Sequence, residues 1–201
     1  MSHVRAIEIV YDRYSPDKMH QRSITAEEAL ERLKRGNSEY INGIYSGNIS
    51  KERRIYVAEN GQHPYAVIVT CSDSRVVPEI IFNAGIGDLF VIRSAGNIVD
   101  GCTLGSIEYA VEHLGCNLAV VLGHTNCGAV AGAIECNDGG HHLDNIDYIV
   151  KVIGDEKDPL VASKMNVMHS VSLLKQDIGE RLGVEIIGAI YNIEEGDVIY
   201  F

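Results

Sequence analysis

The alternation of short β-branched runs with helical patterns is the feature of this sequence that most constrains its fold. Five runs after Pro64 are apolar along their length and have the composition of strands: 65–70, 89–93, 118–123, 184–191 and 197–201. Four longer stretches between them have helical patterns: 74–84, 104–114, 127–135 and 163–183. Strands that are apolar on both faces and alternate with helices predict an α/β fold. We expect a three-layer sandwich with a mainly parallel central sheet of four strands, plus a short fifth edge strand.

The region before this alternation predicts a helical arm at the N-terminus. Thr25 and Glu28 have the spacing of a capping box, in which two side chains satisfy free N–H groups at the start of a helix. Apolar residues follow at roughly helical intervals: Leu30, Leu33, Ile41 and Ile44. Gly36 weakens this predicted helix, and Gly43 and Gly47 mark where we expect it to end. The pattern is that of an amphipathic helix that packs on another part of a protein.

The length of 201 residues fits one domain, which is long enough to bury a single substantial core. We divide the domain into an N-terminal helical arm, 1–60, and an α/β core, 61–201. No apolar run approaches the roughly 18 residues that a membrane helix needs. The first 20 residues carry scattered charges and no uninterrupted apolar stretch of the kind found in secretory signals. We therefore expect a cytoplasmic protein that binds no membrane.

The net charge disfavours one class of partner. The chain has 28 acidic residues against 17 lysines and arginines, which gives a formal net charge of −11. Phosphate backbones repel an acidic protein of this kind, so we expect no nucleic acid partner. We interpret the one dense basic cluster, at 51–54, as a solvated loop.

Three residues that bind metals stand at the predicted ends of two strands. Cys71 ends the first strand, and His124 and Cys127 follow the third. Because the carboxyl ends of neighbouring parallel strands meet at one edge of a sheet, we expect these side chains to lie together. Two thiolates and one imidazole suit zinc, and a set of three leaves one coordination position for water or substrate.

An alternative for the cysteines stays open from the residues alone. The chain has five cysteines, an odd number with no C-x-x-C pair, so a disulfide framework is not expected. A single cysteine at the end of a strand is commonly a small buried apolar residue, and a lone His-x-x-Cys is a weak motif. Packed thiols therefore compete with the zinc site as an interpretation.

Asp73 and Arg75 follow Cys71 closely enough to take part in such a site. Asp73 can reach the fourth coordination position of the metal unless Arg75 holds it through a charge-assisted, bidentate hydrogen bond. Held in that way, Asp73 accepts the proton of a metal-bound hydroxide and directs an oxygen lone pair at substrate. Without a metal, the same pair is an ordinary salt bridge at the start of a helix.

Successive motifs of the chain resemble those of the β-class carbonic anhydrases, in order and in spacing. The motifs are CSDSR at 71–75, GDLFVIRSAGNIV at 87–99, SIEYAVEHLG at 106–115, GHTNCGAV at 123–130 and IIGAIYNIEEGDV at 186–198. The resemblance extends over residues 25–201 and is with the plant-type subgroup of that class.

For the site, the resemblance implies one Zn²⁺ per chain on Cys71, His124 and Cys127. Asp73 and Arg75 match the catalytic dyad of the family. The implied activity is that of a carbonate dehydratase, which reversibly hydrates CO2 to bicarbonate and a proton through attack by zinc-bound hydroxide.

The resemblance also implies a substrate pocket that two subunits share. Gln62, Phe90, Ala95 and Tyr109 fall where the plant-type subgroup lines its pocket. In that subgroup, Gln62, Phe90 and Tyr109 would come from the neighbouring subunit, and only Ala95 from the subunit that holds the zinc. The implied assembly is a homodimer or a higher homo-oligomer with the active site at the subunit interface and an N-terminal arm that wraps the partner.

Two other functions stay open beside this one. Ser94 replaces the asparagine that the family usually has in the motif RSAGN, and some relatives use the same zinc site on carbonyl sulfide or carbon disulfide. A third interpretation is a noncatalytic binding protein, a dimer that zinc stabilises. The tethered carboxylate of Asp73 beside Arg75 favours an enzyme, because a purely structural zinc site does not need it. We interpret His141 and His142 either as a proton relay to buffer or as solvated loop residues.

Overall fold

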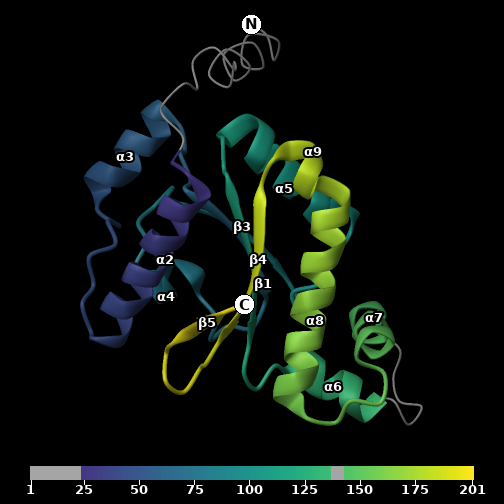
Figure 1. Ribbon diagram of the computed structural model, residues 1–201. Coiled ribbons are helices and arrows are strands. Elements are labelled where there is room, and N and C mark those ends of the chain that lie inside the picture. The colour runs from purple at the N-terminus through teal and green to yellow at the C-terminus, as the bar shows by residue number, and fades with distance from the viewer. Residues whose placement is uncertain (1–23, 137–142) are drawn as a thin grey trace, which may run out of the picture.

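The computed structural model describes residues 24–136 and 143–201, and its central layer is a five-stranded sheet (Figure 1). The strands are β1 (Ala66–Cys71), β2 (Leu89–Ser94), β3 (Leu118–His124), β4 (Glu185–Tyr191) and β5 (Val198–Tyr200). Their order across the sheet is β2, β1, β3, β4, β5, and only β5 runs antiparallel to its neighbour. The predicted α/β fold with a mainly parallel sheet and a short fifth edge strand is confirmed.

Helices cover both faces of this sheet (Figure 1). On one side lie α2 (Ala26–Ile41), α3 (Lys51–Asn60) and α4 (Pro78–Ile81). On the other side lie α5 (Gly101–Leu114), α6 (Gly128–Cys136), α7 (Asp144–Ile153), α8 (Pro159–Leu174) and α9 (Glu180–Leu182). The long helical pattern predicted over 163–183 is α8, a π-helical segment (Lys175–Gly179) and α9. Among the described helices, none has both the length and the apolar character needed to cross a membrane.

The sheet packs into two apolar layers, one on each face. Ile68 of β1 lies in the layer that contains Leu33 of α2 and Phe82 after α4. Val69, the next residue of β1, lies in the opposite layer with Leu174 of α8. Fully burying an apolar side chain of this size contributes about 1.5–3 kcal/mol. Packing on both faces therefore fixes the strands, and with them the carboxyl edge of the sheet at which they end.

Helix α2 begins and ends as the sequence predicts. The hydroxyl of Thr25 accepts a hydrogen bond from the N–H of Glu28 (3.1 Å), and the Glu28 carboxylate accepts one from the N–H of Thr25 (2.8 Å). Gly43, with a φ of +70°, follows the last turn. Leu33 is fully buried against the core of its own chain. The boundary of the arm at residue 60 and its wrapping of a partner stay predictions.

The interpretation of residues 51–54 as a loop is wrong, because they form the first turn of α3. Ser50 caps this helix by accepting a hydrogen bond from the N–H of Arg53 (3.1 Å). The guanidinium of Arg53 in turn donates to the carboxylate of Asp88 (2.8 Å). A serine cap and an ion pair thus give these basic residues a defined conformation.

Helices α4 and α7 also differ from the prediction. The pattern over 74–84 forms only the four-residue helix α4, because Pro78 has no N–H with which to continue a helix from the residues before it. Helix α7 was not predicted at all. Its buried side is nevertheless visible in the helical spacing of Ile146, Ile149 and Ile153.

Candidate metal centre

Three metal-binding side chains meet at the carboxyl edge of the sheet. Cys71 is the last residue of β1, His124 is the last residue of β3, and Cys127 immediately precedes α6. One sulfur or ring nitrogen atom from each residue lies within 4.8 Å of the others, and all three residues are buried. They come together because β1 and β3 are paired neighbours in the sheet. The structure therefore brings together the three residues that the sequence predicts as ligands.

The orientation of His124 suits metal binding. Its Nδ1 lies 2.8 Å from the carbonyl oxygen of Thr125, which can only accept a hydrogen bond, so Nδ1 carries the proton and donates it. Its Nε2 is buried and has no hydrogen-bond partner among the residues that the structure describes. A buried nitrogen lone pair without a partner is costly, and histidines that bind metals fix their second ring nitrogen in this way. With two thiols beside it, this donor set fits zinc.

The two thiols shift the pKa of one another in opposite directions. Hydrogen bonding with Cys127, followed by contributions from His124 and from the N–H of Gly96, lowers the pKa of Cys71 to about 4. The Gly96 N–H lies 3.3 Å from Cys71 Sγ. The pKa of Cys127 is raised, because its thiol donates to Cys71 and because it is buried. A metal cation held by both residues would replace the hydrogen bond between the two thiols and favour two thiolates.

Arg75 holds Asp73 beside these donors. Arg75 Nε donates to Asp73 Oδ1 (3.0 Å), and Arg75 Nη2 donates to Asp73 Oδ2 (2.7 Å). This bidentate bond, with the backbone N–H of Arg75, holds the pKa of the Asp73 carboxyl well below its usual range. Asp73 Oδ2 lies 4.0 Å from Nε2 of His124. Arg75 is itself anchored, since its Nη2 also donates to the carbonyl oxygen of Asn126 (3.0 Å).

Arg93, in β2, fixes the backbone that carries Cys71 and Asp73. Its guanidinium donates to the carbonyl oxygens of Cys71 (3.2 Å), Asp73 (2.7 Å) and Val76 (2.7 Å). Three backbone groups of the turn after β1 are thus tied to one planar side chain. Arg93 was not among the residues predicted for the site, although a charged residue at the end of an apolar run is a signal that could have identified it.

Asn166, on α8, supports the same centre from the other side. Its Nδ2 donates to the carbonyl oxygen of Gly96 (2.7 Å) in a fully buried contact. The N–H of Gly96 faces Cys71 Sγ, so Asn166 orients the peptide chain next to that sulfur. Gly96 has a φ of +75°, a left-handed conformation that favours glycine, and a Cβ there would displace the terminal carbon of Ile149, which would lie 2.4 Å away. Nothing local in the sequence indicated Asn166, because its partner belongs to a distant loop.

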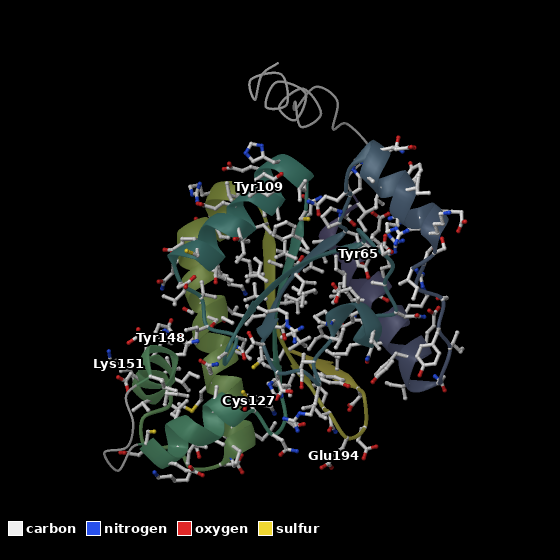
Figure 2. The ribbon with its side chains drawn as sticks, turned by 180° about the vertical axis from the view of Figure 1, so that it is seen from behind. Tyr65, Tyr109, Cys127, Tyr148, Lys151 and Glu194 are labelled. Carbon is white, nitrogen blue, oxygen red and sulfur yellow. The ribbon has the colours of Figure 1, made fainter. Side chains whose placement is uncertain are left out.

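Of the four predicted pocket residues, only Ala95 lies in the loop that contacts the candidate ligands. Phe90 and Tyr109 pack together, with ring centroids 6.2 Å apart, and Tyr109 is 38% exposed. Tyr109 and Cys127 lie toward opposite ends of the molecule (Figure 2). Gln62 precedes β1, at the amino end of the strand that carries Cys71 at its carboxyl end. Within one chain these three residues do not reach the metal-binding side chains.

Comparison with known proteins gives the family. The profile of the family described as carbonic anhydrase matches residues 66–198. Carbonic anhydrase 2 of Mycobacterium tuberculosis is 38% identical over 188 residues, which cover 85% of this chain and 90% of the relative. The carbonic anhydrase of Synechococcus elongatus is 36% identical over 164 residues, which cover 69% of this chain and 60% of the relative.

Solved structures agree with the sequence relatives. The β-carbonic anhydrase CcaA is 30% identical, has a TM-score of 0.66, and covers 86% of this chain and 94% of its own. One of two tetrameric β-carbonic anhydrases from Sordaria macrospora is 28% identical, has a TM-score of 0.64, and covers 75% of this chain and 87% of its own. The chain belongs to the β-carbonic anhydrase family.

Proposed function

We propose that this chain is a carbonate dehydratase that reversibly hydrates CO2 to bicarbonate and a proton at one zinc ion on Cys71, His124 and Cys127. The observation that carries the proposal is the meeting of three soft donors beside an arginine-held carboxylate, in a chain of this family. Zinc bound there would lower the pKa of a water and supply the nucleophile near neutral pH.

The role of Asp73 in this proposal is to orient the attacking water. Both carboxylate oxygens already accept hydrogen bonds from Arg75, and Oδ2 lies 4.0 Å from Nε2 of His124. An oxygen at that distance from a ligand atom can accept a hydrogen bond from water that enters beside the donors. The accepted bond turns an oxygen lone pair toward CO2. Arg75 keeps the carboxylate out of the position that water and substrate need.

The low pKa of Asp73 limits what it does with protons. Because Arg75 stabilises the ionised carboxylate, Asp73 accepts a hydrogen bond but does not retain a proton near neutral pH. The proton that each hydration releases must therefore pass to buffer. The relay histidines that the sequence suggests, His141 and His142, lie outside the described residues.

The proposal includes a second subunit that completes the substrate pocket. Gln62, Phe90 and Tyr109 are far from the metal-binding side chains of their own chain, and Tyr109 is exposed. We place them over the site of the partner in a homodimer, as the resemblance to the plant-type subgroup implies. The Sordaria macrospora relatives are tetramers, which supports an oligomer here.

Hydrolysis of carbonyl sulfide is the second candidate function. The replacement of the usual asparagine by Ser94 is what suggests it. The hydroxyl of Ser94 donates to the carbonyl oxygen of Ile98 (2.9 Å), so it serves the conformation of its own loop. This contact presents no new chemical group to a substrate, so CO2 remains the preferred substrate. Competition between CO2 and carbonyl sulfide, followed by proton release and sulfide release, separates the two activities.

The experiment that tests the proposal compares Cys71→Ala with Cys102→Ala. Cys102 is an exposed thiol at the start of α5 and serves as the matched control. We expect Cys71→Ala to lose bound zinc and CO2 hydration in a stopped-flow assay, and Cys102→Ala to keep both. Undiminished hydration by Cys71→Ala overturns the proposed site. Zinc-loaded wild-type protein without any hydration activity would instead support a noncatalytic binding protein.

A further inference from the structure

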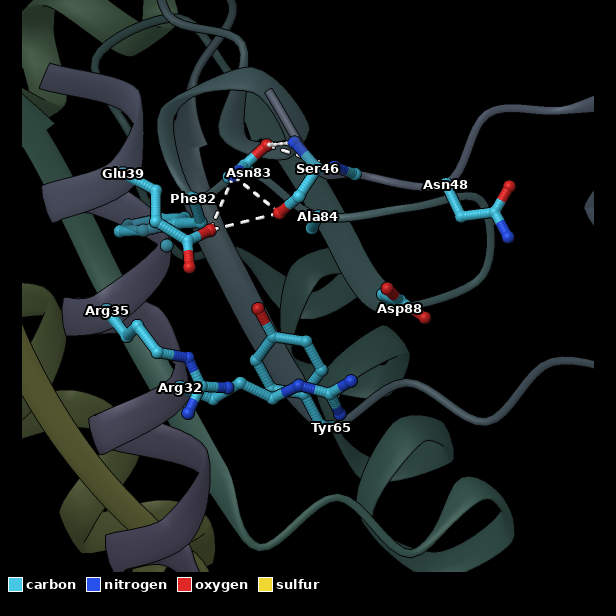
Figure 3. A pocket seen from close by; sticks show the side chains of 12 residues that line it. Arg32, Arg35, Glu39, Ser46, Asn48, Tyr65, Phe82, Asn83, Ala84 and Asp88 are labelled. Atoms are coloured by element: carbon cyan, nitrogen blue, oxygen red, sulfur yellow. Dashed lines mark hydrogen bonds between the residues drawn. The ribbon is translucent and has the colours of Figure 1, made fainter. Parts of the chain in front are cut away.

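A cavity of about 270 Å³ opens beside α2, away from the metal centre (Figure 3). It lies between α2, the residue before β1 and the loop that joins α4 to β2. Tyr65, which lines it, precedes β1, whereas Cys71 ends that strand. Six residues of extended chain at about 3.3 Å each span about 20 Å. The cavity is therefore separate from the candidate metal centre.

Close packing of the backbone fixes the shape of this cavity. A Cβ on Gly36 would lie 1.9 Å from the carbonyl oxygen of Phe82, so α2 lies directly against that chain segment. Asn83 binds the segment after α2: its Oδ1 accepts from the N–H groups of Ser46 (2.8 Å) and Gly47 (3.0 Å). These contacts form walls from parts of the chain that are distant in sequence.

The two acidic side chains that line the cavity have partners of their own. Glu39 accepts hydrogen bonds from Asn83 Nδ2 (2.6 Å) and from the hydroxyl of Ser46 (3.0 Å). Asp88 accepts from Arg53 Nη2 (2.8 Å) and from the N–H of Gly85 (2.9 Å). Both carboxylates are thus engaged, and Arg53 neutralises the charge of Asp88.

Two arginines of the same cavity have no such partner. Arg32 and Arg35 lie three residues apart on α2, and neither forms an ion pair with a carboxylate among the described residues. The guanidinium carbon of Arg32 lies 4.5 Å from the centre of the Tyr65 ring. This stacking orients the arginine but leaves its N–H groups free to bind a ligand. These two guanidinium groups outnumber the one lining carboxylate that has no cationic partner among the described residues, that of Glu39, in a chain whose net charge is −11.

Tyr65 gives the second, independent indication of a ligand. The residue is 7% exposed, and its hydroxyl forms no hydrogen bond within residues 24–136 and 143–201. Figure 3 shows the hydroxyl pointing into the cavity, toward the side where Ser46 and Ala84 lie. Burial raises the pKa of Tyr65, so the hydroxyl keeps its proton and is available as a donor. Although the side chain is buried, its hydroxyl oxygen keeps contact with the cavity, where a bound acceptor could receive its hydrogen bond.

We propose that this cavity binds a small oxyanion, with Arg32, Arg35 and the hydroxyl of Tyr65 as its donors. Planar guanidinium groups match the oxygen geometry of phosphate and of carboxylate and form charge-assisted hydrogen bonds with both. The tyrosine supplies a neutral donor from the buried side. Inorganic phosphate and acetate are the two probes that separate a tetrahedral oxyanion from a carboxylate.

The test titrates the zinc-loaded full chain with each probe and follows the NMR signals of arginine side-chain N–H groups. We expect the signals of Arg32 and Arg35 to move to saturation with at least one probe, while those of Arg54 stay in place. Whichever probe binds more tightly gives the ligand class. Absence of movement at Arg32 and Arg35, or movement confined to Arg75 beside the metal centre, overturns the proposal.

Variants test the same site by affinity. Arg32→Leu and Arg35→Leu should each weaken binding about tenfold, and Tyr65→Phe about fivefold, from the loss of a charged and a neutral hydrogen bond respectively. Arg54→Leu removes an exposed charge of α3 outside the cavity and should have no effect. Equal weakening by Arg54→Leu, or wild-type affinity of Tyr65→Phe, contradicts a built site. All four variants should keep CO2 hydration, so this test stands apart from that of the proposed function.

Discussion

At the scale of single residues, the proposed chemistry depends on how the carboxylate of Asp73 is held. Asp73 lies 4.0 Å from the free nitrogen of His124, close enough to compete with water for a metal. Arg75 occupies both oxygens of Asp73 at hydrogen-bond distance and is itself tied to the carbonyl oxygen of Asn126. In the proposed function, this ion pair therefore decides whether the fourth coordination position of the metal is open to water or closed by Asp73.

Arg75→Ala should release Asp73 and lower CO2 hydration by about 100-fold, the effect of misplacing a positioning group. X-ray absorption of the zinc-loaded variant should then show an additional carboxylate oxygen on the metal in place of water. Arg54→Ala, which removes an exposed arginine of α3, is the control. Full activity of Arg75→Ala with Asp73 still off the metal means that the role assigned to Arg75 is wrong.

The sequence predicted the metal-binding residues and this ion pair because each stands at, or just beyond, the end of an apolar run. A strand end is a local signal, and parallel strands bring such ends to one edge. Arg93 carries the same local signal, since it ends the predicted strand 89–93, but its partners across the sheet were not predicted. Asn166 was missed because it acts on a backbone group of a distant loop, and no local pattern records that contact.

At the scale of elements, α8 supports the loop that carries a donor to Cys71. Asn166 is fully buried on that helix and donates to the carbonyl oxygen of Gly96, whose N–H faces Cys71 Sγ. Asn145, on α7, donates to the carbonyl oxygen of Ala95 (3.1 Å) in an exposed contact. The two asparagines therefore hold adjacent residues of one loop, one from a buried and one from an exposed position.

Asn166→Leu should weaken zinc binding by about 10- to 100-fold, the usual effect of losing a group that orients a metal ligand. Asn145→Leu is the matched control and should change zinc affinity less, because water can replace the exposed donor. Competition with a chelating dye measures both affinities. Equal affinities of wild type and Asn166→Leu would show that the buried hydrogen bond does not act on the centre.

A pair of glycines tests the packing of the helices. Gly36→Ala should lower the free energy of unfolding by about 1–3 kcal/mol, because the added carbon meets the backbone of Phe82. Gly105→Ala, in α5, meets nothing within 4 Å and should raise that free energy by about 0.5–1 kcal/mol. Urea unfolding measures both. An unchanged stability of Gly36→Ala would mean that α2 does not lie against Phe82.

Secondary-structure elements were predicted best where the hydrophobic pattern and the length of a segment indicate the same type of element. All five strands were identified, since buried parallel strands leave continuous apolar runs. Gly36 shows a limit of pattern-based prediction. Its sequence predicts a weakened helix, but in the structure its missing side chain lets α2 pack closely against the backbone of Phe82. The short α4 follows from Pro78, whereas the helical spacing of the isoleucines in α7 was overlooked.

At the scale of the whole molecule, one chain does not assemble the predicted pocket. The metal-binding side chains lie at the carboxyl edge of the sheet, whereas Gln62 lies before the amino end of β1. Tyr109 and Cys127 are toward opposite ends of the molecule (Figure 2). The sequence could imply this division only through its resemblance to a family, because no pattern within one chain encodes which subunit a side chain serves.

Complementation between two defective chains tests the shared pocket. Cys71→Ala lacks a proposed metal ligand, and a Gln62→Ala/Tyr109→Ala chain lacks two proposed pocket residues. If each subunit completes the site of its partner, a heterodimer of these chains contains one wild-type site. Co-expression should then restore CO2 hydration well above that of either homodimer. No gain in activity from purified heterodimer would show that these residues act within their own chain.

The central claim is that CO2 hydration occurs at one zinc held by Cys71, His124 and Cys127. The most direct measurement titrates zinc into metal-depleted protein while CO2 hydration is followed at neutral pH. We predict that activity rises in proportion to bound zinc and stops rising at one zinc per chain. Activity that does not depend on zinc, or that stays absent at full zinc occupancy, would contradict the claim.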